Sequence, residues 1–270
     1  MSGTLEASVG FEVPTPILNS PFIEPAEYWN LREGEPPERL PGRRQAGYYY
    51  RDPRAGVQGA AGSRGVWRDM PLVNTIRGRV KEWQQAGRPG VTRITAELLA
   101  WWERAGRVPR LFYAQKEAVK TIIFLTEART DFLTGLSIPW DDPGEERRAK
   151  GYPGFERRCC KMATGTGKST VAAMLAAWSI LNKQADRGDA RFSDTVLIVC
   201  PNVTIRRRLG ELDPRTGDAS LYRTRDLVPP AMMEGRQAGD ADRIHRDRRQ
   251  GHYRTRQPVF YVRSLRSSAC

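Results

Sequence analysis

The 270 residues are enough for one large domain or two small ones, and with 39% hydrophobic residues the chain can form a packed core. A net charge of +13 and a pI near 10.0 favour a polyanionic partner such as nucleic acid. The four cysteines lack C-x-x-C spacing and there are only two histidines, which argues against a zinc site. No apolar run approaches the ~18 residues of a membrane span. We therefore expect a cytoplasmic protein with buried, reduced thiols.

Residues 1–70 are rich in proline, glycine and charge and show no sustained period. We expect an extended, partly disordered N-terminal region. Its aromatic residues, such as Tyr48, Tyr49 and Tyr50, are interpreted as packing anchors. The alternative is that aromatic and arginine side chains stack on single-stranded bases.

Two helices are predicted next, over 72–85 and 95–105, because apolar residues such as Ile76, Val80 and Trp83 recur at three or four positions. The turn sequence GRPG separates them. This pattern predicts a helical hairpin over residues 71–108.

A third, buried amphipathic helix is predicted over 110–128, with Ala118, Ile122 and Leu125 on its apolar face and Val119 and Ile123 beside them. Gln115 lies near its start, after two aromatic residues. The following segment, 130–155, reads as an insertion loop. Its Asp141 and Asp142 are expected in a solvated turn, because no further ligand lies at metal-binding spacing.

The stretch Lys161–Thr170, KMATGTGKST, reads as a phosphate-binding loop. Gly165 and Gly167 permit backbone turns that let N–H groups converge on a polyphosphate at the start of a helix. Lys168 adds a flexible positive charge, and Ser169 adds a hydroxyl suited to Mg²⁺. The apolar run VAAMLAAWSIL that follows has helical spacing.

The nearly all-apolar sequence TVLIVCPN follows a polar linker and predicts a strand that is covered on both faces. Together with a short strand expected before the loop, this strand would complete a right-handed βαβ unit of a parallel sheet. The next segment is a candidate binding site for the phosphate backbone of nucleic acid. Its candidate residues are Asn202, Thr204, Arg206 and Arg207. The alternative is an ordinary helix start with solvated arginines.

The loop has Met162 where a strict G-x-x-x-x-G-K-[ST] motif has glycine, and its form x-A-T-G-T-G-K-[ST] resembles motif I of superfamily 2 helicases, most closely the motor subunits of type I and type III restriction enzymes. The resemblance covers about residues 70–235. It implies a RecA-like fold, Mg-ATP as ligand, and catalytic roles for Lys168 and Ser169. It also implies that Gln115 reads adenine as a Q motif does, and that the track is double-stranded DNA. The implied nucleotide-binding residues are Gln115, Thr164, Gly165, Thr166, Gly167, Lys168, Ser169 and Thr170.

Further parts of such a motor are missing from the sequence after residue 200: a strand ending in Asp-Glu, a coupling motif and a second lobe with an arginine finger. Residues 201–270 carry 15 arginines, no lysine and 8 acidic residues, and the end of the chain reads as a shifted reading frame or a prematurely ended gene. The alternative is a genuine basic tail for nucleic acid.

The fold class expected is therefore α/β, an incomplete RecA-like P-loop domain with a parallel sheet, preceded by a helical segment and an extended region. The expected boundaries are 1–70, 71–108, 109–235 and a basic, disordered or frame-shifted tail at 236–270. Function is expected to be that of the ATP-binding N-terminal portion of a truncated helicase, inactive in hydrolysis alone. Its expected partners are a modification (methyltransferase) subunit or the missing C-terminal half. The alternative is a non-catalytic basic DNA-binding protein with a vestigial P-loop.

Overall fold

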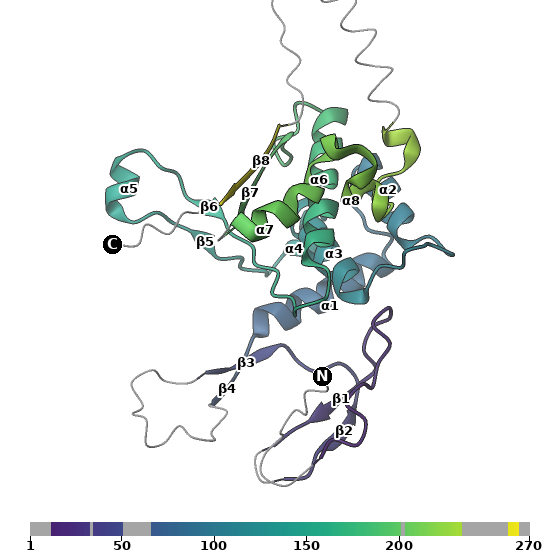
Figure 1. The fold of residues 1–270 in the computed structure, drawn as a ribbon. Helices are drawn as coiled ribbons and strands as arrows, with labels where there is room; N and C mark the ends of the chain where they lie inside the picture. Colours follow the sequence, from purple (N-terminus) through teal and green to yellow (C-terminus); the bar gives the residue numbers. More distant parts are fainter. Residues whose placement is uncertain (1–11, 33–34, 51–65, 201–202, 234–258, 265–270) are drawn as a thin grey trace, which may run out of the picture. The chain divides into compact units, whose positions relative to one another are not determined.

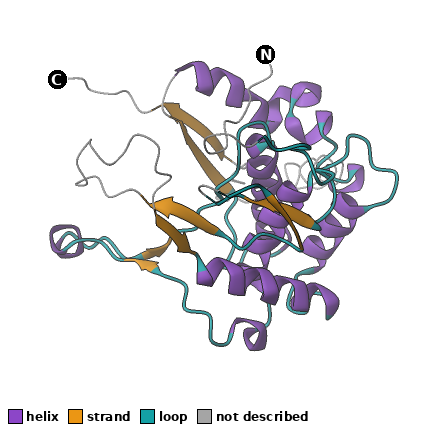
Figure 2. Cartoon of the chain, turned by 90° about the horizontal axis from the view of Figure 1, so that it is seen from below, coloured by secondary structure: helices purple, strands orange, loops and turns teal. Residues whose placement is uncertain are grey.

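The computed structural model describes residues 12–32, 35–50, 66–200 and 203–233, and the backbone of 259–264 (Figure 1). The chain divides into two compact units. The first contains residues 1–87 and 130–158, and the second contains residues 88–129 and 159–270. Helices and short strands are mixed along the described chain, as Figure 2 shows. Among the described residues, no helix is long and apolar enough to cross a membrane.

The first unit is built from short strands and helices. Its elements are β1 (Glu27–Asn30), β2 (Glu38–Pro41), β3 (Gly47–Tyr50), β4 (Val66–Asp69), α1 (Pro71–Gln85), α4 (Thr130–Leu133), β5 (Trp140–Asp141), α5 (Glu145–Ala149) and β6 (Phe155–Glu156). The strands pair as three antiparallel ribbons, β1 with β2, β3 with β4 and β5 with β6.

Two of these ribbons correct the expectation for residues 1–70. The described part of that region is not simply extended, because β1–β2 and β3–β4 are paired strands. Each strand has only four residues, too few for a period to emerge from the sequence. Each strand pairs with the next one along the chain, and what stabilises such a short pair is its side-chain packing, which composition does not reveal.

Residues 130–155 are also more regular than the predicted loop. They contain α4, β5 and α5, and β5 pairs with β6. Asp141 lies in strand β5 and forms an ion pair with Arg157, so it is not in the solvated turn that the sequence suggested. Asp142, the next residue, is exposed.

Helix α1 follows the predicted spacing, with Ile76, Val80 and Trp83 buried. Pro71 occupies the first turn, where its fixed φ suits a helix and its missing N–H is not needed. The next helix along the chain, α2 (Arg93–Glu103), belongs to the second unit. Both helices are confirmed, whereas their packing as a hairpin stays a prediction.

The second unit is mainly helical in its described part. Its elements are α2, α3 (Tyr113–Glu127), α6 (Lys168–Ala185), β7 (Thr195–Cys200), α7 (Val203–Arg208), the 3₁₀ helices η2 (Leu209–Leu212) and η3 (Pro214–Ala219), α8 (Leu221–Thr224) and β8 (Val259–Ser264). Helix α6 contacts α2, α3 and α8 and is the central element of this unit (Figure 1).

The buried stripe of helix α3 is centred on Val119 and Ile123, which the prediction placed beside the apolar face. Val119, Ile123 and Phe124 are fully buried, whereas Ala118, Ile122 and Leu125 are only half-buried. The buried stripe also contains two polar residues, Gln115 and Glu127, which an apolar pattern passes over.

Glu127 is the centre of a buried polar network that joins α2, α3 and α6. Its carboxylate accepts hydrogen bonds from the backbone N–H of Thr92 at 2.8 Å, the hydroxyl of Thr95 at 2.7 Å and the indole N–H of Trp178 at 2.6 Å. Asn182 donates to the Thr95 hydroxyl at 3.0 Å. A buried carboxylate is tolerated when its oxygens are hydrogen-bonded, so this network fixes α6 against both helices.

A second set of long-range contacts holds the segment after α8. The indole N–H groups of Trp101 and Trp102 donate to the carbonyls of Asp226 and Leu227 at 3.0 and 2.7 Å. The guanidinium of Arg107 donates to the carbonyls of Arg225 and Asp226. Three side chains at and after the end of α2 therefore hold three consecutive carbonyls more than a hundred residues away.

Strand β7 is confirmed, but its surroundings differ from the prediction. Leu197 and Val199 are 59% and 51% exposed, so one face of β7 is uncovered in the described structure. Cys200 is buried as expected of a small apolar residue, whereas Cys159 and Cys160 are exposed, contrary to the prediction. No regular strand directly precedes the loop, since residues 157–163 have no assigned element, so the predicted βαβ unit lacks its first strand there.

The strand β8 corrects the interpretation of the tail. Residues 236–270 were predicted to hold no regular element, yet β8 pairs in parallel with β7, with Thr195 opposite Val259 and Cys200 opposite Ser264. Its residues VFYV are β-branched or aromatic, which suits a strand. The rest of the basic tail lies outside the described residues.

Candidate nucleotide-binding site

The site is built at the start of α6. Gly165 and Gly167 have φ values of 82° and 79°, in the left-handed region that favours glycine. Helix α6 begins at Lys168, directly after Gly167. The first backbone N–H groups of a helix have no acceptor within it, and the helix dipole adds partial positive charge there. The loop therefore has the backbone geometry of an anion-binding site.

Side chains of the loop fold onto its own carbonyls. The Lys168 ammonium donates to the carbonyl oxygens of Met162 and Ala163 at 3.3 and 2.9 Å. The Thr166 hydroxyl donates to the same Ala163 carbonyl at 2.7 Å. Lys168 is exposed, so an arriving phosphate can replace these carbonyls as its partner.

The remaining predicted loop residues differ in exposure. Thr164 and Gly165 are exposed, Ser169 is half-buried, and Thr170 is buried with 7% of its surface exposed. The hydroxyl of Ser169 is thus accessible to a ligand, whereas Thr170 is largely enclosed in the first turn of α6.

Gln115 lies against the loop, although it is far from it in the sequence. A Cβ added to Gly167 would lie 2.1 Å from Gln115 Nε2, which is shorter than any real contact of this kind. Gln115 Oε1 accepts the backbone N–H of Phe112 at 2.9 Å and so satisfies the N-cap of α3. The carboxamide is 5% exposed and links the start of α3 to the loop.

Helices α3 and α6 run side by side in the same direction. Gln115 meets Gly167 near the start of α6, and Glu127 meets Trp178 further along it. The pairing of the two helices therefore places Gln115 against the loop. The sequence predicted each residue separately, but no local signal indicates their contact.

Basic residues surround a single carboxylate between α2 and α3. Glu103 pairs with Arg88 at 2.5 Å and with Lys120. Partial burial opposes ionisation of Glu103, but the hydrogen bonds and charges of Lys120 and Arg88 outweigh it and hold its pKa below the ordinary value. The pKa of Lys116, next to Gln115, is lowered mainly by burial and then by the charge of Lys120.

Metal ligands from the protein are sparse at this site. Within the described ranges, no group of three or more His, Cys, Asp or Glu side chains could hold a metal ion. Ser169 is the loop hydroxyl that fits a magnesium ion carried by a polyphosphate, because Mg²⁺ is commonly held by few protein ligands plus phosphate oxygens and water.

The predicted nucleic-acid contacts are only partly described. Thr204, Arg206 and Arg207 are exposed on α7, whose last turn carries three arginines including Arg208. Asn202 lies outside the described residues, so its predicted role is not addressed by the structure.

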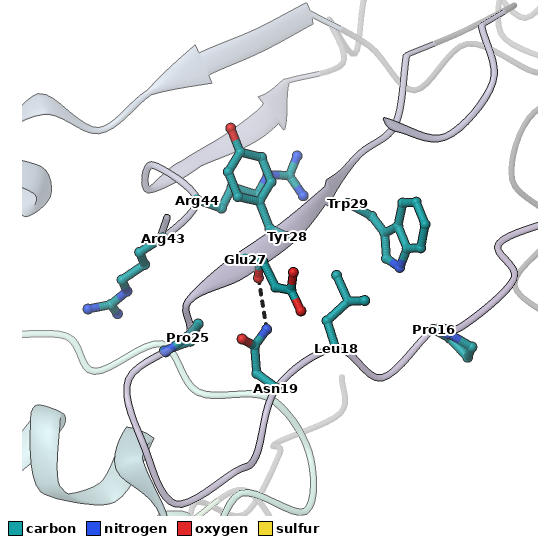
Figure 3. A pocket seen from close by; sticks show the side chains of 9 residues that line it. All are labelled: Pro16, Leu18, Asn19, Pro25, Glu27, Tyr28, Trp29, Arg43 and Arg44. Atoms are coloured by element: carbon teal, nitrogen blue, oxygen red, sulfur yellow. Dashed lines mark hydrogen bonds between the residues drawn. The ribbon is translucent and has the colours of Figure 1, made fainter. Parts of the chain in front are cut away.

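A cavity of about 310 Å³ lies in the first unit and has no P-loop residue in its lining (Figure 3). Leu18 and Trp29 provide apolar walls, and Arg44 adds a charge. The polar groups of two lining residues are already engaged, because the Trp29 indole donates to the Thr15 carbonyl and Asn19 bonds the backbone of Glu27. This cavity does not belong to the nucleotide site.

Comparison with known families now identifies the central segment. Residues 109–216 match the family model of the type III restriction enzyme, res subunit. The segment is therefore similar to a helicase-type domain, and this similarity implies a P-loop fold for it. The match includes α3, the loop, α6, β7 and α7. No curated protein and no solved structure matched the chain.

Proposed function

We propose that this chain binds ATP through the loop before α6, as part of a DNA-dependent helicase or translocase of the type III restriction-enzyme kind. The supporting observation is the combination of two left-handed glycines, a helix that begins at Lys168, and Gln115 packed against Gly167, all within residues 109–216. The proposed fold of this domain is a RecA-like sheet, in which β7 pairs in parallel with β8 from beyond the matched segment.

In this proposal the backbone N–H groups from Gly165 to Ser169 bind the β- and γ-phosphates. Lys168 leaves the carbonyls of Met162 and Ala163 to neutralise phosphate charge. Ser169 holds Mg²⁺, which supplies Lewis-acid stabilisation of the phosphate oxygens. Thr164, Thr166 and Thr170 complete the lining.

Gln115 is proposed to read adenine. Its Oε1 accepts from Phe112 but has a second lone pair, and its Nε2 lies at the loop, so the carboxamide can offer both a donor and an acceptor. The adenine edge offers the matching N7 acceptor and N6 donor.

The proposed track is double-stranded DNA, gripped through its phosphates by Asn202, Thr204, Arg206 and Arg207. A methyltransferase subunit, or a further lobe, is the proposed protein partner. The family match does not favour the alternative of a non-catalytic basic protein with a vestigial loop.

Titration calorimetry with ATP and magnesium tests nucleotide binding. Lys168→Ala should weaken ATP binding more than tenfold, because charge-assisted hydrogen bonds contribute ~1.5–3 kcal/mol each. Lys150→Ala is the control, since Lys150 is an exposed lysine on the surface next to α5 and pairs only with Glu146 among the ion pairs found there. An unchanged dissociation constant in Lys168→Ala would remove the loop from the proposal.

We further propose that the 270-residue chain alone does not hydrolyse ATP at an appreciable rate. Phosphoryl transfer needs a carboxylate that holds Mg²⁺ and an arginine that stabilises the transition state, the latter commonly contributing ~10³–10⁵ in rate. The strand paired with β7 ends in Arg263 and Ser264, without a carboxylate. DNA-stimulated phosphate release that Lys168→Ala abolishes would show that this chain contains the catalytic groups.

A further inference from the structure

The β3–β4 ribbon of the first unit has two chemically different faces. Tyr49 pairs with Trp67, and Tyr48 and Tyr50 pair with Arg68 and Val66. Because successive side chains of a strand point to opposite faces, Tyr49 and Trp67 share one face. The other face carries Tyr48, Tyr50, Arg68 and Val66.

The first face is partly packed, because its side chains contact one another, although Tyr49 remains 41% exposed. The rings of Tyr49 and Trp67 meet edge to face with centroids 5.0 Å apart, and the guanidinium of Arg44 lies 4.9 Å from the Trp67 ring. Trp67 also covers Gly47, where an added Cβ would lie 2.2 Å from the indole. Its indole N–H donates to Asp69 at 2.7 Å. This face holds the ribbon together.

The second face is uncovered in the structure. Tyr48 and Tyr50 are each 45% exposed, and Val66 is 61% exposed. Arg68, directly opposite Tyr48, is exposed as well. Two aromatic side chains side by side on an exposed ribbon are not explained by the packing of this unit, and exposed apolar groups gathered on one face indicate a binding surface.

The charge around this face selects the kind of partner. The described residues 41–50 and 66–70 contain three arginines and one aspartate, with no lysine or glutamate. A surface that combines exposed rings with excess arginine fits a polyanion with flat, stackable groups, which is single-stranded nucleic acid. In a duplex the base faces are already stacked on each other, so they are not available to tyrosine rings.

The spacing of the two tyrosines fits this occupant. Residues two apart in a strand are separated by about 6.7 Å. A planar base that contacts a ring on each side at ~3.5 Å needs a separation of about 7 Å. Arg68, on the same face, is placed to neutralise the adjoining phosphate.

We propose that Tyr48, Tyr50 and Arg68 form a binding surface for single-stranded nucleic acid, with bases stacked on the two tyrosine rings. The surface belongs to the first unit, contains no P-loop residue and does not require nucleotide binding. It extends the proposed function, because it gives the chain a place for unpaired bases in addition to the duplex contacts proposed on α7.

The test uses fluorescence anisotropy of the full chain with a labelled oligothymidylate of about 20 nucleotides, long enough to span a typical single-strand site. The double variant Tyr48→Leu, Tyr50→Leu keeps apolar bulk but removes both rings, and binding should weaken at least about tenfold. The double variant Tyr48→Phe, Tyr50→Phe keeps the rings and should bind within about twofold of the parent chain.

A matched control replaces two exposed aromatic residues elsewhere in the same unit, Trp140→Leu and Tyr152→Leu, which are 56% and 61% exposed. This control should leave oligothymidylate binding unchanged, as should Lys168→Ala in the P-loop. An unchanged melting temperature, within about 2 °C, shows that the leucine variants fold. Photocrosslinking to an iodouracil-substituted strand should label Tyr48 or Tyr50 in the parent chain.

Several results would overturn the proposal. Retained binding in the leucine pair, or equal loss in the Trp140 and Tyr152 control, excludes stacking at this surface. Equal loss in the phenylalanine pair means that the hydroxyls and not the rings bind. An equal loss of duplex affinity means that the face contacts only the phosphate backbone. Loss of single-strand binding in Lys168→Ala would place the strand at the motor, and a failure of ATP binding alone leaves this proposal standing.

Discussion

Replacing Gly167 by alanine tests the contact between the P-loop and α3. At a φ of 79° alanine adopts the left-handed conformation at a cost of roughly 1–2 kcal/mol. Its Cβ would also lie 2.1 Å from Gln115 Nε2, and overpacking of this kind costs a further ~1–3 kcal/mol. Gly167→Ala should therefore lower the free energy of unfolding by about 2–5 kcal/mol.

The steric part of this cost depends on Gln115 and can be separated from the backbone part. In a Gln115→Ala background the obstructing carboxamide is gone, so Gly167→Ala should cost only the ~1–2 kcal/mol of backbone strain. Gly165→Ala provides the control, because Gly165 has a similar φ of 82° but no atom within 4 Å of an added Cβ. It should show no coupling to Gln115→Ala.

Urea unfolding of the four chains of this double-mutant cycle, monitored by circular dichroism, gives the coupling free energy. We expect ~1–3 kcal/mol between positions 115 and 167, and less than ~0.5 kcal/mol between positions 115 and 165. If the costs at 115 and 167 add within ~0.5 kcal/mol, Gln115 does not pack against the loop, and the proposed adenine contact loses its geometric basis.

Glu127→Gln should lower the free energy of unfolding of the second unit by ~1–3 kcal/mol in urea, because the new amide N–H₂ would face one of the groups that now donate to the carboxylate. Glu97→Gln, at an exposed position, is the control. Equal losses in the two variants would contradict the buried network. Glu103 has a depressed folded pKa, so its contribution is complete above the ordinary glutamate pKa and is lost as pH falls through the folded value. The difference in melting temperature between the parent chain and Glu103→Gln should therefore shrink below about pH 4. A difference that grows below this pH would show that the pKa of Glu103 is not lowered on folding. Duplex DNA affinity should fall steeply between about 50 and 200 mM salt. The double variant Arg206→Ala, Arg207→Ala should reduce the slope of log affinity against log salt by about 2. An affinity that does not change with salt would show that the positive charge of the chain does not contribute to DNA binding.

The helices of the second unit were predictable because their signals are local. Apolar spacing indicated α3 and α6, and the glycine pattern indicated the loop at the start of α6. The centre of the buried stripe of α3 was predicted one residue away, since Gln115 and Glu127 on that stripe are polar residues whose burial depends on partners in the loop and in α6.

The strands were harder to predict, for one reason in the second unit and another in the first. Strand β7 was recognised from its own apolar run, but β8 pairs with it from a segment read as an irregular tail. The short ribbons of the first unit contain four residues per strand, so no periodic signal distinguishes them from coil. The contact of Gln115 with Gly167 is likewise tertiary, and only the family resemblance, which assigns both residues to one nucleotide, indicated that they lie close together.

The hydrogen bonds from the tryptophans of α2 to the carbonyls of Asp226 and Leu227 affect how the second unit folds. Trp101 and Trp102 are synthesised more than a hundred residues before the carbonyls that accept their indole protons. Until Leu227 has left the ribosome, the two indole rings lack their native hydrogen-bond acceptors, and the end of α2 cannot make its native contacts. Such non-local contacts form slowly, and the nascent chain exposes apolar surface while it waits. The second unit should therefore complete its folding late, when the segment after α8 emerges, and chaperones should bind it before that point.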